Sequence, residues 1–563
     1  MTINLLQMEN AAIADNFSLL GKLIDIHGDD SFKAKSYSSS AFTIDKLPVQ
    51  LSTLTAEKIF SLKGIGQTTG KKILEQLETG RLSVLEEYIQ KTPAGVLELL
   101  NIKGLGPKKI STVWKELGVE SVGELLYACE ENRLLLYKGF GEKTQQNIKE
   151  SINFYLSNQG SYLYGKIEGY AMAITLKLKE SFPGQRIEIT GDFNRQMEVI
   201  DKLEWATNIK PQQIIDFFIA NDYKVEVLDY TIKAKGDENV TLEIHCTLSE
   251  KVSALLFEKN CSTEFLQTWQ NKFGDNIPSE LISEVDIFKN YKLPFIPVCY
   301  REKEYAVTQA IDNKLPKLIT IQDIKGLIHT HSDWSDGRDT IDAMAQNAIA
   351  LGYEYLVISD HSQTAVYANG LNPDRIKAQH ELIHELNDKY KPFKIFKSIE
   401  SDILNDGRLD YSDEILSTFD LVIASVHSNL RMPEEKAMMR LLNAISNPYT
   451  TILGHMTGRL LLSRNGYPVS YKTIIEACVK NNVVIELNAH SRRLDIDWRH
   501  IKEATDAGVL ISIDPDAHYT TGFEDIRFGV LVAQKGGLTA QQNLSSFSLS
   551  EFESFLKLKK IAL

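Results

Sequence analysis

Cysteine is scarce in this sequence. Its five cysteines are spread over 563 residues and form no Cys-x-x-Cys pair. Such spacing excludes a disulfide framework and a zinc site built from thiolates. We therefore expect five reduced cysteines in the protein core.

Long hydrophobic runs are also missing, and no uncharged apolar stretch reaches the roughly 18 residues that a membrane span needs. The first residues lack the basic start and the cleavage site of a signal peptide. Acidic residues outnumber basic ones, which gives a formal net charge of -13. We expect a cytoplasmic protein without a membrane partner, in which any contact with nucleic acid depends on local motifs rather than on a basic surface.

Three repeats occupy the N-terminal part of the chain. They read LKGIGQTTGKKI at residues 62–73, IKGLGPKKISTV at 102–113 and, more loosely, YKGFGEKTQQNI at 137–148. In each, a lysine and a Gly-x-Gly turn precede a helical pattern. Glycine permits a positive φ and puts no side chain in front of the turn, so backbone N–H groups at the helix start can face a phosphate oxygen. A plain glycine turn between packed helices is the alternative.

This spacing resembles the helix-hairpin-helix motif, which holds the DNA backbone without reading its sequence. The resemblance explains how an acidic chain can hold DNA. It predicts DNA contacts from nine residues, namely Lys63, Gly64, Gly66, Lys103, Gly104, Gly106, Lys138, Gly139 and Gly141.

Segments 31–48 and 70–88 have the pattern of amphipathic helices, and they resemble the small N-terminal domain of family X DNA polymerases. The resemblance puts Lys72 where the lyase members of that family carry a Schiff-base lysine. Such a nucleophile must lose its proton, and a solvated helical lysine is the alternative interpretation.

Residues 156–320 alternate helical patterns with short β-rich runs, which suits the α/β palm of a nucleotidyltransferase. The same family resemblance places that domain here. Within EITGDFNRQMEVIDKLEWA at 188–206, Arg195 and Glu198 keep the frame of the polymerase motif.

The metal ligands of that motif are altered. Lys202 and Glu204 stand where an Asp-x-Asp pair should hold two Mg²⁺ ions, and Leu242 or Glu243 takes the place of the third aspartate. A lysine brings a positive charge to the place of a dication, which is unfavourable. We therefore expect a degenerate palm that takes Mg²⁺ only if it is active. A shifted register that uses Asp201, Glu204 and Glu243 is the alternative.

Histidine is concentrated at the other end of the chain, where ten of the twelve follow residue 325. Short runs of valine, isoleucine and leucine end at a histidine or an acid, and helical patterns such as 339–353 and 471–482 separate these runs. Repeated βα units predict a barrel of parallel strands whose carboxyl ends meet at one pocket. Nine side chains should converge there: His329, His331, Asp336, His361, Glu400, His427, His455, Asp516 and His518.

Taken alone, any one of these histidines is explained by a buried ring bonded to a backbone carbonyl. Nine such groups at one barrel mouth are costly to bury without cations. Nitrogen and oxygen donors without thiolate suit Zn²⁺, Mn²⁺ or Fe²⁺ better than Ca²⁺ or Mg²⁺ alone. The set therefore predicts a centre of several metals.

This constellation resembles the PHP phosphoesterase domain, and the resemblance implies three divalent metals. The first would be held by His329, His331, Glu400 and Asp516. Glu400 would bridge to the second, which His427 and His455 also hold. The third would be held by Asp336, His361 and His518.

Two arginines are candidates for contact with the substrate. Arg459 and Arg493 can pair with a phosphate, because a guanidinium matches its oxygens. Each could instead form a structural ion pair. Asp360 and His490 are predicted to support the ligands from outside.

Over essentially the whole chain these motifs resemble the bacterial family X DNA polymerases with a PHP domain. The implied fold is multidomain, α and α/β, with helix-hairpin-helix domains, a nucleotidyltransferase-like palm and a C-terminal distorted (β/α)7 barrel. The implied domains are a lyase-like domain at 1–88, a fingers-like domain at 89–155, a degenerate palm and thumb at 156–320, and the PHP domain at 321–563.

The resemblance implies a monomeric repair protein that hydrolyses DNA phosphoesters, as a 3'-5' exonuclease or in 3'-end processing, on gapped DNA or at a 3' end. An active gap-filling polymerase with an exonuclease is one alternative. A small-molecule phosphatase of the histidinol-phosphatase type is another, and a DNA-binding scaffold without catalysis is a third.

Overall fold

The computed structural model describes residues 8, 10–45, 47, 49–62, 64–157, 160–236, 240–274, 277–278 and 281–561. Lys63, a predicted DNA contact, lies outside the described residues. The chain folds into two compact units, Met1–Tyr155 and Leu156–Leu563.

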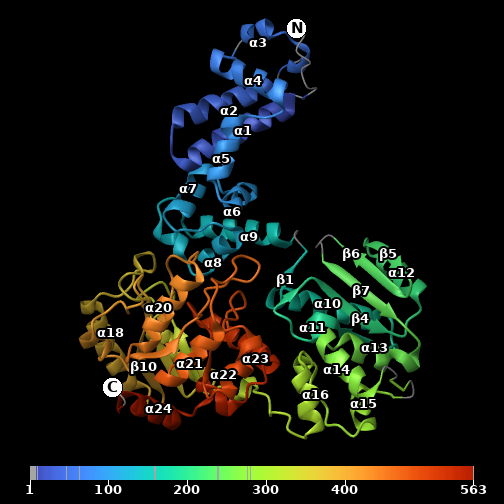
Figure 1. The fold of residues 1–563 in the computed structure, drawn as a ribbon, viewed down its shortest axis with the longest axis vertical. Helices are drawn as coiled ribbons and strands as arrows, with labels where there is room; N and C mark the ends of the chain where they lie inside the picture. Colours follow the sequence, from blue (N-terminus) through green and yellow to red (C-terminus); the bar gives the residue numbers. More distant parts are fainter. Residues whose placement is uncertain are drawn as a thin grey trace. The chain divides into compact units, whose positions relative to one another are not determined.

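The first unit is helical (Figure 1). Its α-helices are α1 (Asn10–His27), α2 (Ser31–Asp45), α3 (Ala56–Ser61), α4 (Gln67–Thr79), α5 (Ser83–Lys91), α6 (Ala94–Glu98), α7 (Pro107–Lys115), α8 (Val122–Glu130) and α9 (Glu142–Ser157). Phe17 and Leu20 of α1 are fully buried, and Phe17 stacks on Tyr37 of α2. The helical segment predicted at 70–88 is two helices, because Gly80 adopts φ 72° and caps α4.

The three Gly-x-Gly turns share one backbone geometry. Gly64, Gly104 and Gly139 have φ of 87°, 85° and 95°, which a side chain would strain. The second glycine of the first two turns, Gly66 and Gly106, is the N-cap of α4 and of α7. Glycine is therefore required at the first position of every turn.

The second unit begins with a five-stranded sheet in the order β2-β4-β7-β6-β5, in which β4 and β7 are parallel and the other pairs antiparallel. Its strands are β2 (Ile187–Thr190), β4 (Lys202–Thr207), β5 (Lys224–Leu228), β6 (Thr231–Lys235) and β7 (Thr241–Cys246). Next to it, β1 (Tyr162–Leu163) pairs with β3 (Val199–Ile200).

Helices cover both faces of this sheet. On one face α10 (Tyr164–Ser181) and α12 (Pro211–Ala220) bury Leu203 and Trp205. On the other face α13 (Val252–Lys259) packs on Ala206. Since side chains alternate along a strand, Lys202 and Glu204 belong to the second face. The helices that follow are α14 (Thr263–Phe273), α15 (Glu284–Asn290) and α16 (Glu304–Ile311).

The predicted (β/α)7 barrel is confirmed by a sheet of seven parallel strands in chain order. These are β8 (Gly326–Thr330), β9 (Tyr355–Ile358), β10 (Lys394–Asp402), β11 (Leu421–Ser425), β12 (Thr450–Leu453), β13 (Val484–Asn488) and β14 (Ile511–Asp514). One parallel bridge beyond the named strands, Thr330 with Ala517, links the first strand to the segment after the last. The barrel is therefore nearly closed, with a seam between β8 and β14.

Helices connect or follow these strands and pack around the barrel (Figure 1). They are α17 (Ile341–Ala350), α18 (Pro373–Lys389), α19 (Asp413–Leu416), α20 (Glu434–Ser446), α21 (Tyr471–Asn481), α22 (Ile501–Asp506), α23 (Ile526–Lys535) and α24 (Leu549–Ile561).

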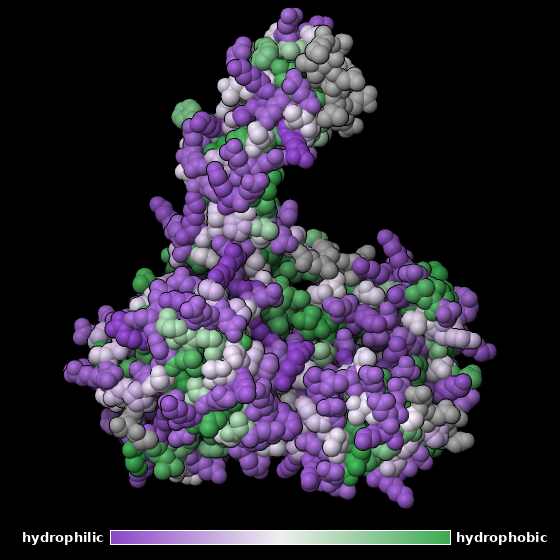
Figure 2. Space-filling model, in the orientation of Figure 1, coloured by the Kyte–Doolittle hydropathy of each residue, from purple (hydrophilic) through white to green (hydrophobic). Residues whose placement is uncertain are grey.

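The visible surface is mostly hydrophilic, with smaller apolar patches (Figure 2). One of them lies near β5, where Val227 and Leu228 are exposed. All five cysteines are free and buried, as expected. In the described part of the chain, none of the helices has the length and apolar character of a membrane span.

Candidate metal centre

The nine predicted ligands converge at the carboxyl ends of the barrel strands. His329 lies in β8, Glu400 in β10, and the others follow strands, apart from Asp336 in the loop after His331. All nine side chains are buried, with exposed fractions of 5% or less. His329 and Asp516 have left-handed backbones, with φ of 60° and 51°. Such strain is typical of functional sites.

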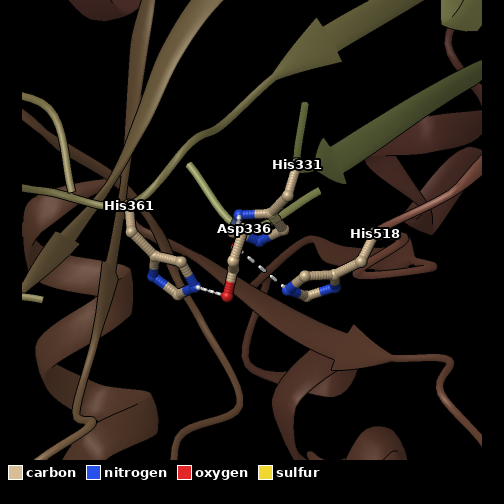
Figure 3. A group of neighbouring side chains, drawn as sticks. All are labelled: His331, Asp336, His361 and His518. Carbon is tan, nitrogen blue, oxygen red and sulfur yellow. Dashed lines mark ion pairs between the residues drawn. The ribbon is translucent and has the colours of Figure 1, made fainter. Parts of the chain in front are cut away.

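One group consists of His331, Asp336, His361 and His518, whose donor atoms lie within 4.8 Å of one another. Figure 3 shows Asp336 pointing between the rings of His361 and His518. Its carboxylate oxygens are 3.5 Å from His361 Nε2 and 3.4 Å from His518 Nε2. The ring of His331 stacks on that of His518 at 4.3 Å.

Glu400 lies at the centre of the other groups. Its Oε1 is 3.0 Å from His427 Nε2 and 2.9 Å from His455 Nε2. The same oxygen is 3.3 Å from His329 Nε2, and Oε2 is 2.9 Å from His361 Nδ1. The central position of Glu400 fits the predicted bridge, and His361 lies beside Glu400 as well as beside Asp336.

The last group joins the two sides of the barrel seam. Asp516 Oδ1 is 3.1 Å from His331 Nε2 and 3.5 Å from His329 Nε2. Arg493 is buried, and its Nε lies 3.6 Å from Asp516 Oδ2. A guanidinium therefore stands at the edge of the cluster.

Three carboxylates support the ligands from outside, and sequence reasoning identified only Asp360. Asp360 accepts hydrogen bonds from Ser332 N and from the Ser332 and Ser335 hydroxyls, which orders the loop before Asp336. Glu486 contacts His329 Nδ1, and Asp402 lies 2.5 Å from His427 Nδ1. Such contacts fix the tautomer of a ligating imidazole. Glu486 was detectable, since it lies in the run VVIELNAH at a strand end.

Burial and neighbouring charges shift the pKa values of the histidines and acids in the cluster. Burial and the nearby His518 and His361 lower the pKa of His331 to about 3. Burial and Arg493 lower the pKa of His455 to about 3. Burial would raise the pKa of Glu400, but the surrounding imidazoles hold it well below its ordinary value.

Burial would lower the pKa of His329 and His361 as well, but Glu486 beside His329 and Asp336 beside His361 raise it well above the ordinary value. Ionised acids and neutral imidazoles are the donor forms that bind cations, so a cation would displace protons from these two rings.

Several buried donor atoms make no hydrogen bond of good geometry among the described residues, although some lie at ion-pair distance from a neighbouring ligand. They include His329 Nε2, both ring nitrogens of His331 and of His361, and Glu400 Oε2. Buried polar atoms without such hydrogen bonds are unfavourable, and these face one another. The residues present therefore fit a cluster of cations that nitrogen and oxygen donors hold.

Arg459 does not have the position expected of a phosphate ligand. Its Nη1 lies 2.5 Å from Asp497 Oδ2, its Nε donates to the Arg493 carbonyl at 2.9 Å, and its Nη2 donates to the Leu494 carbonyl. All three nitrogens thus support the loop that carries Arg493. Arg459 thus forms a structural ion pair with Asp497, which was the alternative interpretation of this residue.

In the palm, Lys202 lies between two acids. Its Nζ is 3.0 Å from Glu204 Oε1 and 2.6 Å from Glu243 Oε2, because these acids are neighbours on the parallel strands β4 and β7. His245 Nε2 is 3.0 Å from Glu204. Of the residues in the shifted register, Glu204 and Glu243 lie together with His245 in a group that could hold a metal ion. Asp201, in contrast, lies outside that group and accepts a hydrogen bond from Ser161 at 2.6 Å.

The remaining predicted residues lie in the helical unit. Lys103 and Lys138 are exposed beside their glycine turns. Lys72 lies half-buried on α4, one turn before Gln76, whose side chain donates to the Lys72 carbonyl at 3.3 Å. Its lyase role stays a prediction.

Three family models match the sequence. A helix-hairpin-helix domain matches residues 8–82, a SAM-like helix-hairpin-helix tandem matches 96–153, and the PHP domain matches 328–490. These matches agree with the repeats and with the barrel motifs.

The relatives differ in how much of this chain they cover. The DNA polymerase/3'-5' exonuclease PolX of Bacillus subtilis (strain 168) is 32% identical over 575 residues, which cover 95% of this chain and 97% of PolX. A probable phosphatase of Thermoanaerobacter sp. (strain X514) is 27% identical over 247 residues, 41% of this chain and 94% of the phosphatase. The probable phosphatase YcdX of Escherichia coli O127:H6 (strain E2348/69 / EPEC) is 30% identical over 193 residues, 31% of this chain and 71% of YcdX. Given a full-length match to PolX and the order of its domains, this chain belongs to the bacterial family X DNA polymerases that carry a C-terminal PHP domain.

Proposed function

We propose that the protein hydrolyses DNA phosphoesters at a 3' end, as a 3'-5' exonuclease or 3'-end-processing enzyme in DNA repair. The observation that carries this proposal is the convergence of nine buried histidines and acids at one end of the barrel, in overlapping groups whose donor atoms lie within 4.8 Å of one another.

In this proposal three divalent cations, Zn²⁺ or Mn²⁺ with Fe²⁺ as a further candidate, occupy the barrel. Bound cations of this kind lower the pKa of a water and polarise a phosphoester. His329, His331, Glu400 and Asp516 would hold one, Glu400 would bridge to a second with His427 and His455, and Asp336 with His361 and His518 would hold a third.

The residues of the chain have separate roles around this centre. Arg493 binds the non-bridging phosphate oxygens, because its guanidinium already lies beside Asp516. Glu486 and Asp402 orient the imidazoles of His329 and His427. Burial of the ligands excludes bulk water from all but the substrate side.

The helix-hairpin-helix turns are proposed to hold DNA. Gly104 and Gly139 leave open space in front of their turns. A Cβ atom placed on either glycine would have no atom of the described residues within 4 Å, apart from those of the glycine and its chain neighbours. A phosphate oxygen can approach the N–H groups there, and the exposed Lys103 and Lys138 add charge. Residues 1–88 and 89–155 would then bind gapped DNA as parts of a monomer, while the barrel at 321–563 cleaves.

We propose that the palm at 156–320 no longer synthesises DNA efficiently. The ammonium groups of Lys202 and Lys233 already pair with Glu204 and Glu243, and their positive charge opposes the binding of Mg²⁺ there. An active gap-filling polymerase is the second candidate, because the full-length relative PolX is described as both polymerase and exonuclease.

Three assays on the Mn²⁺-loaded protein test the proposal. We expect shortening of a 5'-labelled strand from its 3' end, weak turnover of p-nitrophenyl phosphate and no template-dependent extension. His331→Ala should abolish the shortening and keep DNA binding. Preferred turnover of the small phosphomonoester would identify a phosphatase, and extension that Glu204→Gln removes would identify a polymerase.

A further inference from the structure

Two polymerase-motif residues of the palm, Glu198 and Arg195, contact the barrel. Glu198 is buried and accepts hydrogen bonds from Trp498 Nε1 at 3.2 Å and from Arg499 Nη1 at 2.9 Å. The backbone carbonyl of Arg195 accepts one from Lys535 Nζ at 2.7 Å. Both contacts join segments about 300 residues or more apart within one compact unit.

Close packing surrounds these polar contacts. A Cβ added to Gly165 of α10 would lie 2.5 Å from the ring of Phe528 in α23, so a glycine is required there. A cavity of about 10 Å³ remains between Tyr164, Glu198, Leu494 and neighbouring side chains. It offers room for about one water molecule at most. The palm and the loop around Leu494 therefore cannot shift independently without loss of contacts.

A chain of contacts leads from Glu198 to the metal centre. Arg499 binds Asp497 as well as Glu198, at 2.9 Å in both cases. Asp497 in turn binds Arg459, at 2.5 Å.

Arg459 completes the connection. It donates to the backbone carbonyls of Arg493 and Leu494. Arg493 then reaches Asp516, one of the nine converging residues. The palm thus fixes the loop 491–499 at its far end, and the guanidinium of Arg493 lies at the other end.

We propose that Glu198 is a positioning residue for phosphoester hydrolysis: the palm holds the loop 491–499 so that Arg493 stays at the metal centre. This inference rests on the proposed function, because it assigns the substrate phosphate to Arg493. It gives the altered palm a use other than synthesis. The carboxylate of Glu198 binds Arg499, so Glu198→Gln is the informative change.

A double-mutant cycle tests the inference on the full chain with Mn²⁺ and a 3'-labelled duplex. We expect Glu198→Gln to lower kcat/KM by roughly tenfold, mainly through KM, because the phosphate contact is misplaced. In an Arg493→Ala background the same change should lower kcat/KM by less than about twofold, since both act through one contact. Equal losses in the two backgrounds would overturn the proposal.

Hydrogen exchange supplies a readout that does not depend on activity. Amides in residues 491–499 should exchange faster in Glu198→Gln, with unchanged metal content. Trp498→Phe, which keeps an aromatic side chain but loses the indole N–H and some buried volume, should act in the same direction. Glu188→Gln is the matched control, because Glu188 forms an exposed ion pair with Arg186 elsewhere in the palm. It should change neither readout.

The two proposals fail in different ways. If the unmodified protein cleaves no phosphoester, the proposed function fails, and the exchange rates still report on the loop. If exchange in residues 491–499 is the same in Glu198→Gln as in the unmodified protein, the positioning role fails whatever the enzyme cleaves.

Discussion

At the scale of single residues, Glu400 is the carboxylate with contacts to four imidazoles of the candidate centre. Its two oxygens face four imidazoles, so no neighbouring side chain can replace it. We expect Glu400→Gln to lose bound metal and to lower hydrolysis by about 10³-fold or more. Elemental analysis and cleavage of a 3'-labelled duplex check both effects.

His380→Ala is the control for that change. His380 lies half-buried on α18, where its ring contacts Phe419, and it belongs to none of the metal-type groups among the described residues. Its loss should leave the metal content unchanged. A Glu400→Gln protein with full metal content would contradict the central role of Glu400.

A second residue-scale prediction concerns acid and the palm. Burial raises the pKa of Glu204, but its contacts with His245 and Lys202 outweigh burial and lower the pKa from 4.5 to about 2. A lowered pKa in the folded state stabilises the protein above pH 4.5, and this stabilisation disappears as the pH falls towards 2. Urea unfolding, followed by the fluorescence of the buried tryptophans, should show a smaller loss of stability between pH 5 and about 3 in Glu204→Gln than in the unmodified protein. Identical pH profiles would contradict the ion pair.

At the scale of elements, the helix-hairpin-helix turns can be tested one at a time. Gly104→Ala places a side chain at φ 85°, which costs about 1 kcal/mol, and it obstructs the approach of a phosphate. We expect DNA affinity, measured by fluorescence anisotropy, to fall by roughly fivefold. Gly118→Ala is the control, because Gly118 has φ 70° and lies outside the three turns. An equal loss for both variants would indicate a general effect of strain.

The elements also show how far the sequence alone could lead. The barrel was predictable because each βα unit ends a short apolar run at a ligand, and parallel strands bring those ends together. The contact of Lys202 with Glu243 was not predictable, because the two residues are 41 positions apart and meet only through the pairing of their strands. The role of Arg459 was not predictable either, because the backbone carbonyl that it binds belongs to Arg493, 34 residues away. Local pattern identifies a side chain, and only the fold identifies its partner.

At the scale of the whole molecule, the two compact units should respond differently to chelation. Cations that bind only the folded barrel stabilise it, and the helical unit offers no metal-type group among its described residues. We expect EDTA to lower the calorimetric transition of the unit 156–563 by roughly 5–10 °C and to leave that of the helical unit unchanged. Added Mn²⁺ should restore the first transition. A parallel shift of both transitions would contradict independent units.

The seam of the barrel has a further consequence. A single bridge links Thr330 to Ala517, and ligands flank it on both sides, with His329 and His331 on one and Asp516 and His518 on the other. Cations at these residues would cross-link the first strand of the barrel to the segment after the last strand. A chelated preparation would then rely on the segment 543–545 to cover the seam. Asn543 bridges Ile511 there, and the Ser545 carbonyl accepts a hydrogen bond from Lys325 N at 2.8 Å. Any strand edge that opens at the seam offers the geometry from which intermolecular sheets grow. Handling of the enzyme without metal should therefore promote aggregation, and light scattering during dialysis against EDTA would record its onset.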